Sequence, residues 1–328
     1  MICELEDKIF NFQPQETEAL ALSVFRFQYE NNQVYSSYVN ALGISPGAVT
    51  RLSQIPFLPI RFFKEQQVKT TEFNPELHFE SSGTTSSQVS RHLLKKKSVY
   101  CESFTRGFEH FYSNPSEWCI VGLLPSYLER KHSSLVMMVD ALIKQSHHPL
   151  SGFYLYDHEQ LHQVLQKLEK AGRPALLIGV TFALIDFAEK HPFQMRSTIV
   201  METGGMKGRK EELTREEVHA VLQSAWGLKE VHSEYGMTEL LSQAYSKGKG
   251  IFNCPPWMNI LIRQEDDPFK MEKNGRGVIS VIDLANLYSC SFIETEDLGY
   301  LHPDGSFEVL GRVDASEARG CSLMLSEL

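Results

Sequence analysis

The stretch Ala175-Leu-Leu-Ile-Gly-Val180, followed directly by Thr181-Phe-Ala-Leu-Ile-Asp-Phe-Ala-Glu189, decides the fold class of this chain. A short apolar run is typical of a buried strand, and the residues after it have the apolar spacing of a helix. The same order recurs on both sides, in Trp118–Leu124 then Ser133–Lys144, and in Ser197–Met201 then Thr214–Trp226. Strands that alternate with helices predict an α/β fold, with a largely parallel sheet covered by helices.

The regions outside this alternation have a different pattern of apolar and turn residues. Residues 1–70 are expected to be mostly helical, whereas the proline-rich stretch Ile55–Lys64 favours an extended segment. After Gly250, short alternating runs such as Gly277–Asp283 and Ser306–Leu310 predict a small antiparallel subdomain over about residues 250–310. The clearest single element is a helix from Thr214, where Thr214-Arg-Glu-Glu217 fits a capping box and Gly227 fits a C-terminal stop.

Composition excludes several classes of function. The net charge of -9 argues against a nucleic-acid partner, because binding phosphates needs clustered Lys and Arg. The longest apolar stretch, around Ala175 to Ile185, is too short to insert into a membrane, and no export signal precedes it, so we expect a cytoplasmic protein. Six scattered cysteines without a Cys-x-x-Cys pair predict reduced thiols rather than disulfides or a zinc site.

A run of small hydroxyl residues is the first candidate for chemistry. Phe79-Glu-Ser-Ser-Gly-Thr-Thr-Ser-Ser87 offers backbone N–H groups and hydroxyls to phosphate oxygens, and its glycine permits tight curvature. The candidate phosphate-binding residues are Ser81, Ser82, Gly83, Thr84 and Thr85. Arg91 and His92 follow closely and offer positive charge. Taken alone, such a run is more often a flexible surface linker.

A second motif lies farther along the chain. Glu234-Tyr-Gly-Met-Thr-Glu239 follows an expected strand at Lys229–His232, so we expect it in a loop at the carboxyl end of that strand, where α/β sheets bind ligands. Tyr235 offers a flat ring for a base, and Gly236 lets the chain turn past it. Thr238 and Glu239 can orient phosphates and Mg²⁺, which prefers carboxylate and phosphate oxygens.

In this order, the two motifs resemble the phosphate loop and the Tyr-Gly-x-Thr-Glu motif of the adenylate-forming superfamily, which includes acyl-CoA synthetases and luciferases. The resemblance implies that Gly204 and Gly205, in Glu202-Thr-Gly-Gly205, lie against adenine. It also implies that Asp297, in Thr295-Glu-Asp-Leu-Gly299, holds the ribose hydroxyls and that Arg312, in Gly311-Arg-Val-Asp314, lies near the ribose. The Pro-Lys that usually follows the phosphate loop is missing, which leaves Arg91 as the substitute candidate.

Further stretches narrow the resemblance to a subfamily. Phe62-Phe-Lys64, Cys254-Pro-Pro-Trp-Met258 and Ile282-Asp-Leu-Ala-Asn-Leu287 are similar to acyl-protein synthetases of the luminescence type. The chain stops at Leu328, so we expect the large domain without the superfamily's mobile C-terminal domain. The family pattern implies that Cys321, on a short tail, accepts the acyl group as a thiolate.

The combined expectation is an adenylate-forming large domain over residues 1–310, followed by a hinge and short tail over 311–328. It would use ATP and Mg²⁺, with Glu239 as metal ligand, to convert a carboxylic acid, most simply a fatty acid, to acyl-AMP. The acyl group would pass to Cys321 and on to an acyl reductase or another acyl-acceptor protein. Two alternatives stay open: an acyl- or aryl-CoA ligase that uses coenzyme A, and a non-catalytic module that binds nucleotide or acyl groups.

Overall fold

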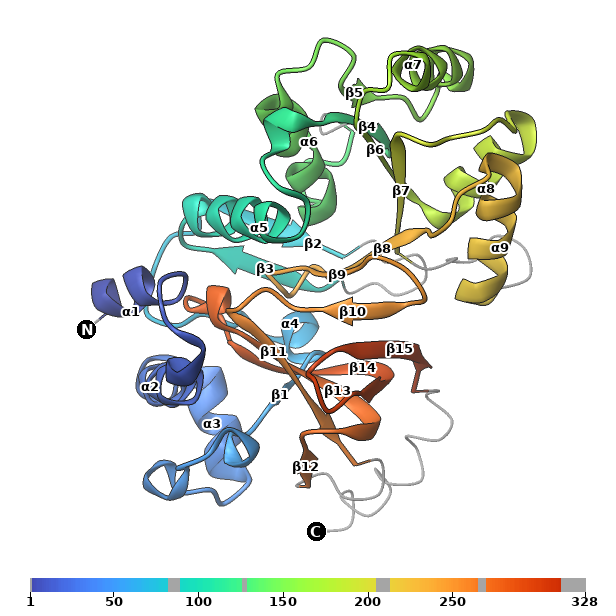
Figure 1. The fold of residues 1–328 in the computed structure, drawn as a ribbon. Coiled ribbons are helices and arrows are strands. Elements are labelled where there is room, and N and C mark those ends of the chain that lie inside the picture. Colours follow the sequence, from blue (N-terminus) through green and yellow to red (C-terminus); the bar gives the residue numbers. More distant parts are fainter. Residues whose placement is uncertain (1, 82–88, 126–128, 205–212, 265–269, 314–328) are drawn as a thin grey trace. The chain divides into compact units, whose positions relative to one another are not determined.

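The computed structural model describes residues 2–81, 89–125, 129–204, 213–264 and 270–313, and the chain forms two compact units (Figure 1). Unit 1 comprises Met1–Phe73 and Pro256–Leu328, and unit 2 is the continuous segment Asn74–Pro255. In the sequence, unit 2 therefore lies between the two segments that form unit 1. Across the part of the chain described, no helix is long and apolar enough to cross a membrane.

Unit 2 is built on a mixed sheet in the order β10-β9-β8-β7-β6-β4-β5. Five of its strands run parallel: β4 (Cys119–Leu123), β5 (Gly152–Phe153), β6 (Ala175–Val180), β7 (Thr198–Thr203) and β8 (His232–Tyr235). Two antiparallel strands extend it beyond β8: β9 (Ala244–Ser246) and β10 (Ile251–Asn253). A separate hairpin joins β2 (Leu77–Glu80) to β3 (Arg91–Leu94).

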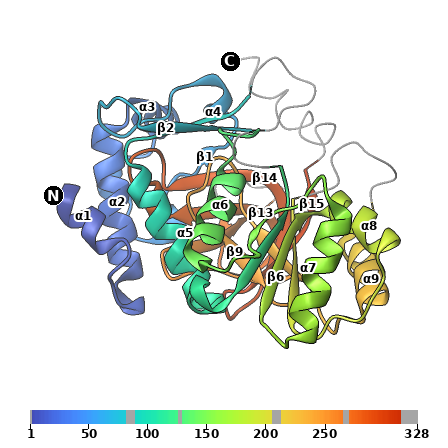
Figure 2. The ribbon, with the colours of Figure 1, turned by 90° about the horizontal axis from the view of Figure 1, so that it is seen from above.

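Helices cover both faces of this parallel sheet, as Figure 2 shows from above. They are α5 (Lys97–Tyr112), α6 (Ser134–Ser146), α7 (His158–Lys170), α8 (Thr181–Lys190) and α9 (Arg215–Trp226), with a short 3₁₀ turn at Pro115–Glu117. Side chains of α7, α8 and α9 pack on the face that carries Val121 and Leu177, whereas α6 contacts the opposite face near Gly122. A sheet buried on both faces needs strands that are apolar throughout, which explains the continuous run in β6.

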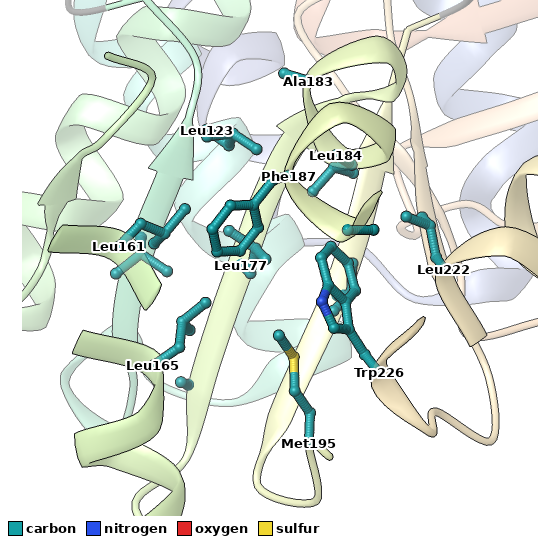
Figure 3. Packing of buried hydrophobic residues seen from close by; sticks show 14 of the residues in the cluster. Leu123, Leu161, Leu165, Leu177, Ala183, Leu184, Phe187, Met195, Leu222 and Trp226 are labelled. Carbon is teal, nitrogen blue, oxygen red and sulfur yellow. The ribbon is translucent and has the colours of Figure 1, made fainter. Parts of the chain in front are cut away.

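The core between this sheet and its helices is drawn in Figure 3. Leu161 and Leu165 of α7, Phe187 of α8 and Trp226 of α9 converge on the strands and are fully buried. The Trp226 indole N–H donates to the carbonyl of His191 at 3.1 Å, so its one polar atom is satisfied. Each such side chain contributes about 1.5–3 kcal/mol through apolar burial. The core therefore fixes the strands whose ends are described below.

Unit 1 combines an antiparallel sheet with the N-terminal helices. The sheet runs β12-β11-β13-β14-β15, and β1 pairs parallel with β14. Its strands are β1 (Leu58–Pro59), β11 (Met258–Arg263), β12 (Met271–Glu272), β13 (Gly275–Asp283), β14 (Phe292–Leu301) and β15 (Phe307–Arg312). The helices are α1 (Ile2–Lys8), α2 (Thr17–Asn31), α3 (Gln33–Ala41) and α4 (Phe62–Glu65), with 3₁₀ turns at Pro14–Glu16, Pro46–Ala48, Leu52–Gln54 and Leu284–Asn286.

The sequence predicted the architecture correctly and two segments wrongly. The parallel sheet with helices, the antiparallel strands near the C-terminus and the Thr214 capping box with its left-handed Gly227 stop are all confirmed. The strand expected at Lys229–His232 instead runs over His232–Tyr235, because the buried side chains begin only at Val231. The stretch Ile55–Lys64 is extended only as far as β1, and α4 begins at Phe62, after the last proline.

A buried amide fastens α2 to the connection between β13 and β14. The Gln28 amide nitrogen donates to the carbonyls of Asn286 and Leu287, each at 3.0 Å, and to the Ser291 hydroxyl at 3.2 Å. Its oxygen accepts from the Ser291 backbone N–H at 2.9 Å. Gln28 has no exposed surface, so no water can replace these partners.

Gln28→Leu should lower the free energy of unfolding by at least about 2 kcal/mol, because it leaves several buried polar groups without a partner. Urea unfolding followed by fluorescence measures this loss. Gln33→Leu is the matched control, since Gln33 is exposed at the start of α3, and it should change stability by at most about 0.5 kcal/mol. Equal stabilities of the two variants would contradict the role of Gln28.

Candidate active site

The candidate site of unit 2 lies where β6, β7 and β8 end. The parallel registers pair Val180 with Thr203, and Thr203 with Glu234. Residues that directly follow these strands therefore meet at one edge, which brings Gly204 beside the segment that begins at Tyr235. Open α/β sheets bind their ligands at this carboxyl edge.

The turn at Gly204 is held by the first residue of α8, which directly follows β6. Gly204 has a φ of 75°, a left-handed conformation that glycine adopts without strain. Its carbonyl accepts from the hydroxyl of Thr181, the first residue of α8, at 2.6 Å. The same hydroxyl lies 3.3 Å from a carboxylate oxygen of Glu202. Thr181 thus links the end of β6 to the end of β7.

Glu202 is a buried carboxylate with charged neighbours on α9. Arg215 Nε lies 3.4 Å from its Oε1, and His219 Nε2 lies 3.8 Å from the same oxygen. Burial alone would raise the pKa of Glu202, but hydrogen bonds from His219 and Ser233 and the charge of Arg215 together lower it. Glu202 is therefore ionised near neutral pH, and α9 is oriented by this charge.

Glu234 is a second buried carboxyl, on the neighbouring strand. Its Oε2 accepts from the Thr203 hydroxyl. Burial, with a smaller contribution from the charge of Glu202, raises the pKa of Glu234 to about 7 against the effect of this hydrogen bond. In turn, Glu234 adds to burial in raising the pKa values of three nearby phenols, Tyr100, Tyr112 and Tyr245.

Gly236 lies directly against this carboxyl group. A Cβ atom at position 236 would lie 2.4 Å from Glu234 Oε1 and 3.3 Å from Gln243 Cγ. The chain turns closely over Glu234 immediately after the strand. This steric reason for the glycine was not visible in the motif itself.

The Tyr235 ring is fixed by an aromatic neighbour on β10. Its centroid lies 5.9 Å from that of Phe252 at an interplanar angle of 61°. The guanidinium carbon of Arg215 lies 5.2 Å from the Phe252 centroid, and the same guanidinium contacts Glu202. Tyr235 is only 8% exposed, because it is the last residue of β8. The predicted strand ended three residues earlier, at His232.

Thr238 and Glu239 lie in the turn that follows. Glu239 is buried, and Thr238 is half-buried with its carbonyl 3.0 Å from His92 Nδ1. Burial lowers the pKa of His92 to about 4, against a smaller opposite effect of the Thr238 hydrogen bond. His92 is therefore neutral at physiological pH, and the expectation that it supplies positive charge is wrong.

The hydroxyl-rich segment is described only at its edges. Ser81 directly follows β2, and its backbone N–H donates to the Ser90 carbonyl at 3.1 Å. Arg91 is mostly exposed and pairs with Glu80 across the hairpin, Nε to Oε1 at 3.2 Å. Ser82, Gly83, Thr84, Thr85, Gly205 and Cys321 lie outside the described residues.

Two predicted residues meet in unit 1. Asp297 and Arg312 are paired positions of β14 and β15, and Arg312 Nε lies 3.5 Å from Asp297 Oδ1. The Asp297 side chain is 13% exposed and that of Arg312 71%. The Thr295 hydroxyl accepts from the Asp297 backbone N–H at 3.1 Å and so fixes the strand there. The Thr-Glu-Asp segment is part of a strand and not a loop.

Among the residues that the structure describes, no group of three or more His, Cys, Asp or Glu side chains could hold a metal ion by itself. Four cysteines in this part of the chain, Cys101, Cys119, Cys254 and Cys290, form no disulfide.

Sequence reasoning assigned no role to Thr181, Glu202 or Glu234. A signal was present, since a glutamate is the next-to-last residue of both β7 and β8. Only the register shows that the two glutamates lie on adjacent strands and share the edge.

Carboxylate ligases that form adenylates share this fold. An open conformation of 2-hydroxyisobutyryl-CoA ligase, in complex with 2-HIB-AMP and CoA, matches with a TM-score of 0.64 and 12% identity over 94% of this chain and 78% of that chain. ATP-bound MatB from Rhodopseudomonas palustris matches with a TM-score of 0.56 and 14% identity over 74% of this chain. The match spans half the length of MatB. The expected adenylate-forming fold is thereby confirmed.

The chain belongs to the acyl-protein synthetase family LuxE, whose family model matches residues 6–328. A curated relative, the long-chain-fatty-acid–luciferin-component ligase of Vibrio harveyi, is 21% identical over 357 residues, which cover 99% of this chain and 93% of that protein. The resemblance drawn from the sequence motifs is confirmed.

The raised pKa of Glu234 makes stability depend on pH. Because the folded pKa of about 7 exceeds the ordinary 4.5, this group's contribution is complete below pH 4.5 and is lost as the pH rises through 7. Between these pH values the wild-type protein should lose up to about 1.4 kcal/mol of unfolding free energy per pH unit through Glu234. Glu234→Gln should not show this loss, because the amide cannot ionise while its oxygen still accepts from Thr203. Unfolding free energies at pH 5, 6, 7 and 8 measure the difference from wild type.

The exposed Glu216 of α9 provides the control, and Glu216→Gln should keep the wild-type pH dependence. If Glu234→Gln loses as much stability as wild type between pH 5 and 8, Glu234 does not titrate in this range.

Proposed function

We propose that this protein activates a carboxylic acid with ATP to an acyl-adenylate and then transfers the acyl group to a cysteine of its own chain. The observation that carries the proposal is the β7–β8 register, which brings Gly204 and the Tyr235–Glu239 segment to one sheet edge. Membership of the acyl-protein synthetase family supports the same reaction.

In the first step a carboxylate oxygen of the acid attacks the α-phosphorus of ATP. A bond forms between these atoms, and the bond from the α-phosphorus to the bridging oxygen of pyrophosphate breaks. Negative charge that develops on the phosphates needs donors that are already in place. We assign this role to the segment Ser81–Thr85, with Arg91 as the candidate cation.

The metal-binding role is assigned to Glu239, with the Thr238 hydroxyl beside it. A single buried carboxylate fits Mg²⁺, which nucleotide-binding enzymes commonly hold with one or two carboxylates, substrate phosphates and water. Mg²⁺ bound there would offset charge on the phosphates.

Recognition of the nucleoside is divided between two sets of residues. Tyr235, Gly204 and Gly205 are proposed to contact adenine, and the fixed Tyr235 ring suits this because its orientation is set by Phe252. Asp297 is proposed to accept hydrogen bonds from the ribose hydroxyls. Its partner Arg312 lies 3.5 Å from it and orients the carboxylate.

The second step transfers the acyl group to a thiol. The Cys321 thiolate attacks the acyl carbon, the bond to the AMP oxygen breaks, and AMP leaves. Residues 311–328 would act as a hinge and tail that bring Cys321 to the adenylate. Long-chain fatty acids are the proposed substrates, and an acyl reductase or similar protein in the cytoplasm is the proposed final acceptor.

Replacement of Glu239 tests the first step. Glu239→Gln keeps the shape of the side chain and removes its charge, so pyrophosphate exchange should fall at least ~10²-fold while the protein stays folded. Exchange is measured with a panel of fatty and aromatic acids. Glu216→Gln, on an exposed face of the same unit, should exchange like wild type. A folded Glu239→Gln protein with normal exchange would contradict the assignment.

Replacement of Cys321 separates the two steps. With ATP, Mg²⁺ and a labelled fatty acid, the wild-type chain should carry a hydroxylamine-sensitive adduct on Cys321. Cys321→Ser should retain pyrophosphate exchange and lose the thioester, whereas Cys254→Ser should retain both. Label on the Cys321→Ser variant, or formation of acyl-CoA by an unlabelled wild-type chain once coenzyme A is added, would favour another acceptor.

A further inference from the structure

His92 connects the two motif-bearing segments of unit 2. It lies on β3, two residues beyond Ser90, whose N–H donates to the Ser81 hydroxyl at 3.0 Å and closes the hairpin. His92 is 1% exposed, and its Nδ1 lies 3.0 Å from the carbonyl oxygen of Thr238, 146 residues away in the chain. The ring thus reaches from the hairpin to the turn that carries Thr238 and Glu239.

The protonation of His92 follows from its partner. A carbonyl oxygen can only accept a hydrogen bond, so the proton must be on Nδ1. His92 therefore acts on this turn through one N–H of fixed direction.

This N–H determines the orientation of a whole peptide unit. The Thr238 carbonyl and the Glu239 N–H belong to one planar group, so fixing the carbonyl also fixes the backbone at Glu239. The segment has other anchors at its ends. Gly236 turns closely over Glu234, and the Ser242 hydroxyl lies 3.0 Å from that of Ser103 on α5. His92 acts between these anchors, at the residues proposed to bind phosphate and metal.

We propose that His92 is a positioning residue, which sets the orientation of Thr238 and Glu239 for Mg·ATP through its hydrogen bond to the Thr238 carbonyl. This inference rests on the proposed function of the two residues and adds a residue that touches neither metal nor nucleotide. A partly buried carbonyl that loses its partner can reorient or bind water, and either change turns the following carboxylate.

The test compares His92→Asn, His92→Gln and His92→Leu. The Asn amide nitrogen occupies nearly the place of histidine Nδ1, the Gln amide nitrogen lies nearer to that of Nε2, and Leu has no donor. Calorimetry measures the Kd for Mg·ATP, and pyrophosphate exchange measures the Mg²⁺ concentration at half-maximal rate. We expect His92→Leu to raise both about 10-fold, His92→Asn to stay within about 3-fold of wild type, and His92→Gln to behave like Leu.

The KM for the acid should not change in any variant, because the turn is assigned to phosphate and metal. A purely structural histidine would instead lower the melting temperature and leave the Mg²⁺ dependence of the folded protein unchanged. A folded His92→Leu variant with the wild-type Kd and Mg²⁺ dependence overturns the proposal. If the Leu variant does not fold, equal behaviour of Asn and Gln overturns it.

Failure of the proposed function has a different signature. A wild-type protein that does not bind Mg·ATP overturns the assignment of the whole site. Wild-type binding that is lost in Glu239→Gln but unaffected in His92→Leu overturns the role of His92 alone.

Discussion

The parallel pairing of β7 with β8 is the constraint on which the candidate site of unit 2 depends. It sets Thr203 against Glu234 and so places two buried carboxyl groups on neighbouring strands. Two ionised carboxylates cannot share a site of low polarity without compensation. The two carboxyl groups differ in their pKa. Arg215 and His219 keep Glu202 ionised. Burial and the charge of Glu202 raise the pKa of Glu234 to about 7.

The ionised Glu202 and the buried Glu234 carboxyl each position neighbouring segments. The ionised Glu202 holds α9 through Arg215, whose guanidinium also lies over Phe252 and so reaches the ring that contacts Tyr235. The Glu234 carboxyl occupies the space that a side chain at position 236 would enter, so a larger residue there would displace it. The two segments at the edge, at Gly204 and at Tyr235–Glu239, are thus shaped by buried polar groups that need not contact a ligand.

Much of the fold was predictable because its signals are local. The apolar run of β6, the capping box at Thr214 and the alternation in β13 each reflect the burial or capping of a single element. The start of β8 was misplaced, because its inward residues include Ser233 and Glu234, which no hydrophobic pattern identifies as buried. The helix α4 was missed because four residues are too few to show a period.

The sequence by itself determined the class of fold, the family and the motif residues, since hydrophobic period and short motifs are properties of contiguous residues. The tertiary structure alone decided that Thr181, Glu202 and Glu234 share an edge, that His92 is neutral, and that Asp297 meets Arg312. The physical reason is that pKa values, hydrogen-bond partners and register depend on which residues of distant segments are buried together. Strand pairing and helix packing set those neighbours, and no stretch of sequence records them.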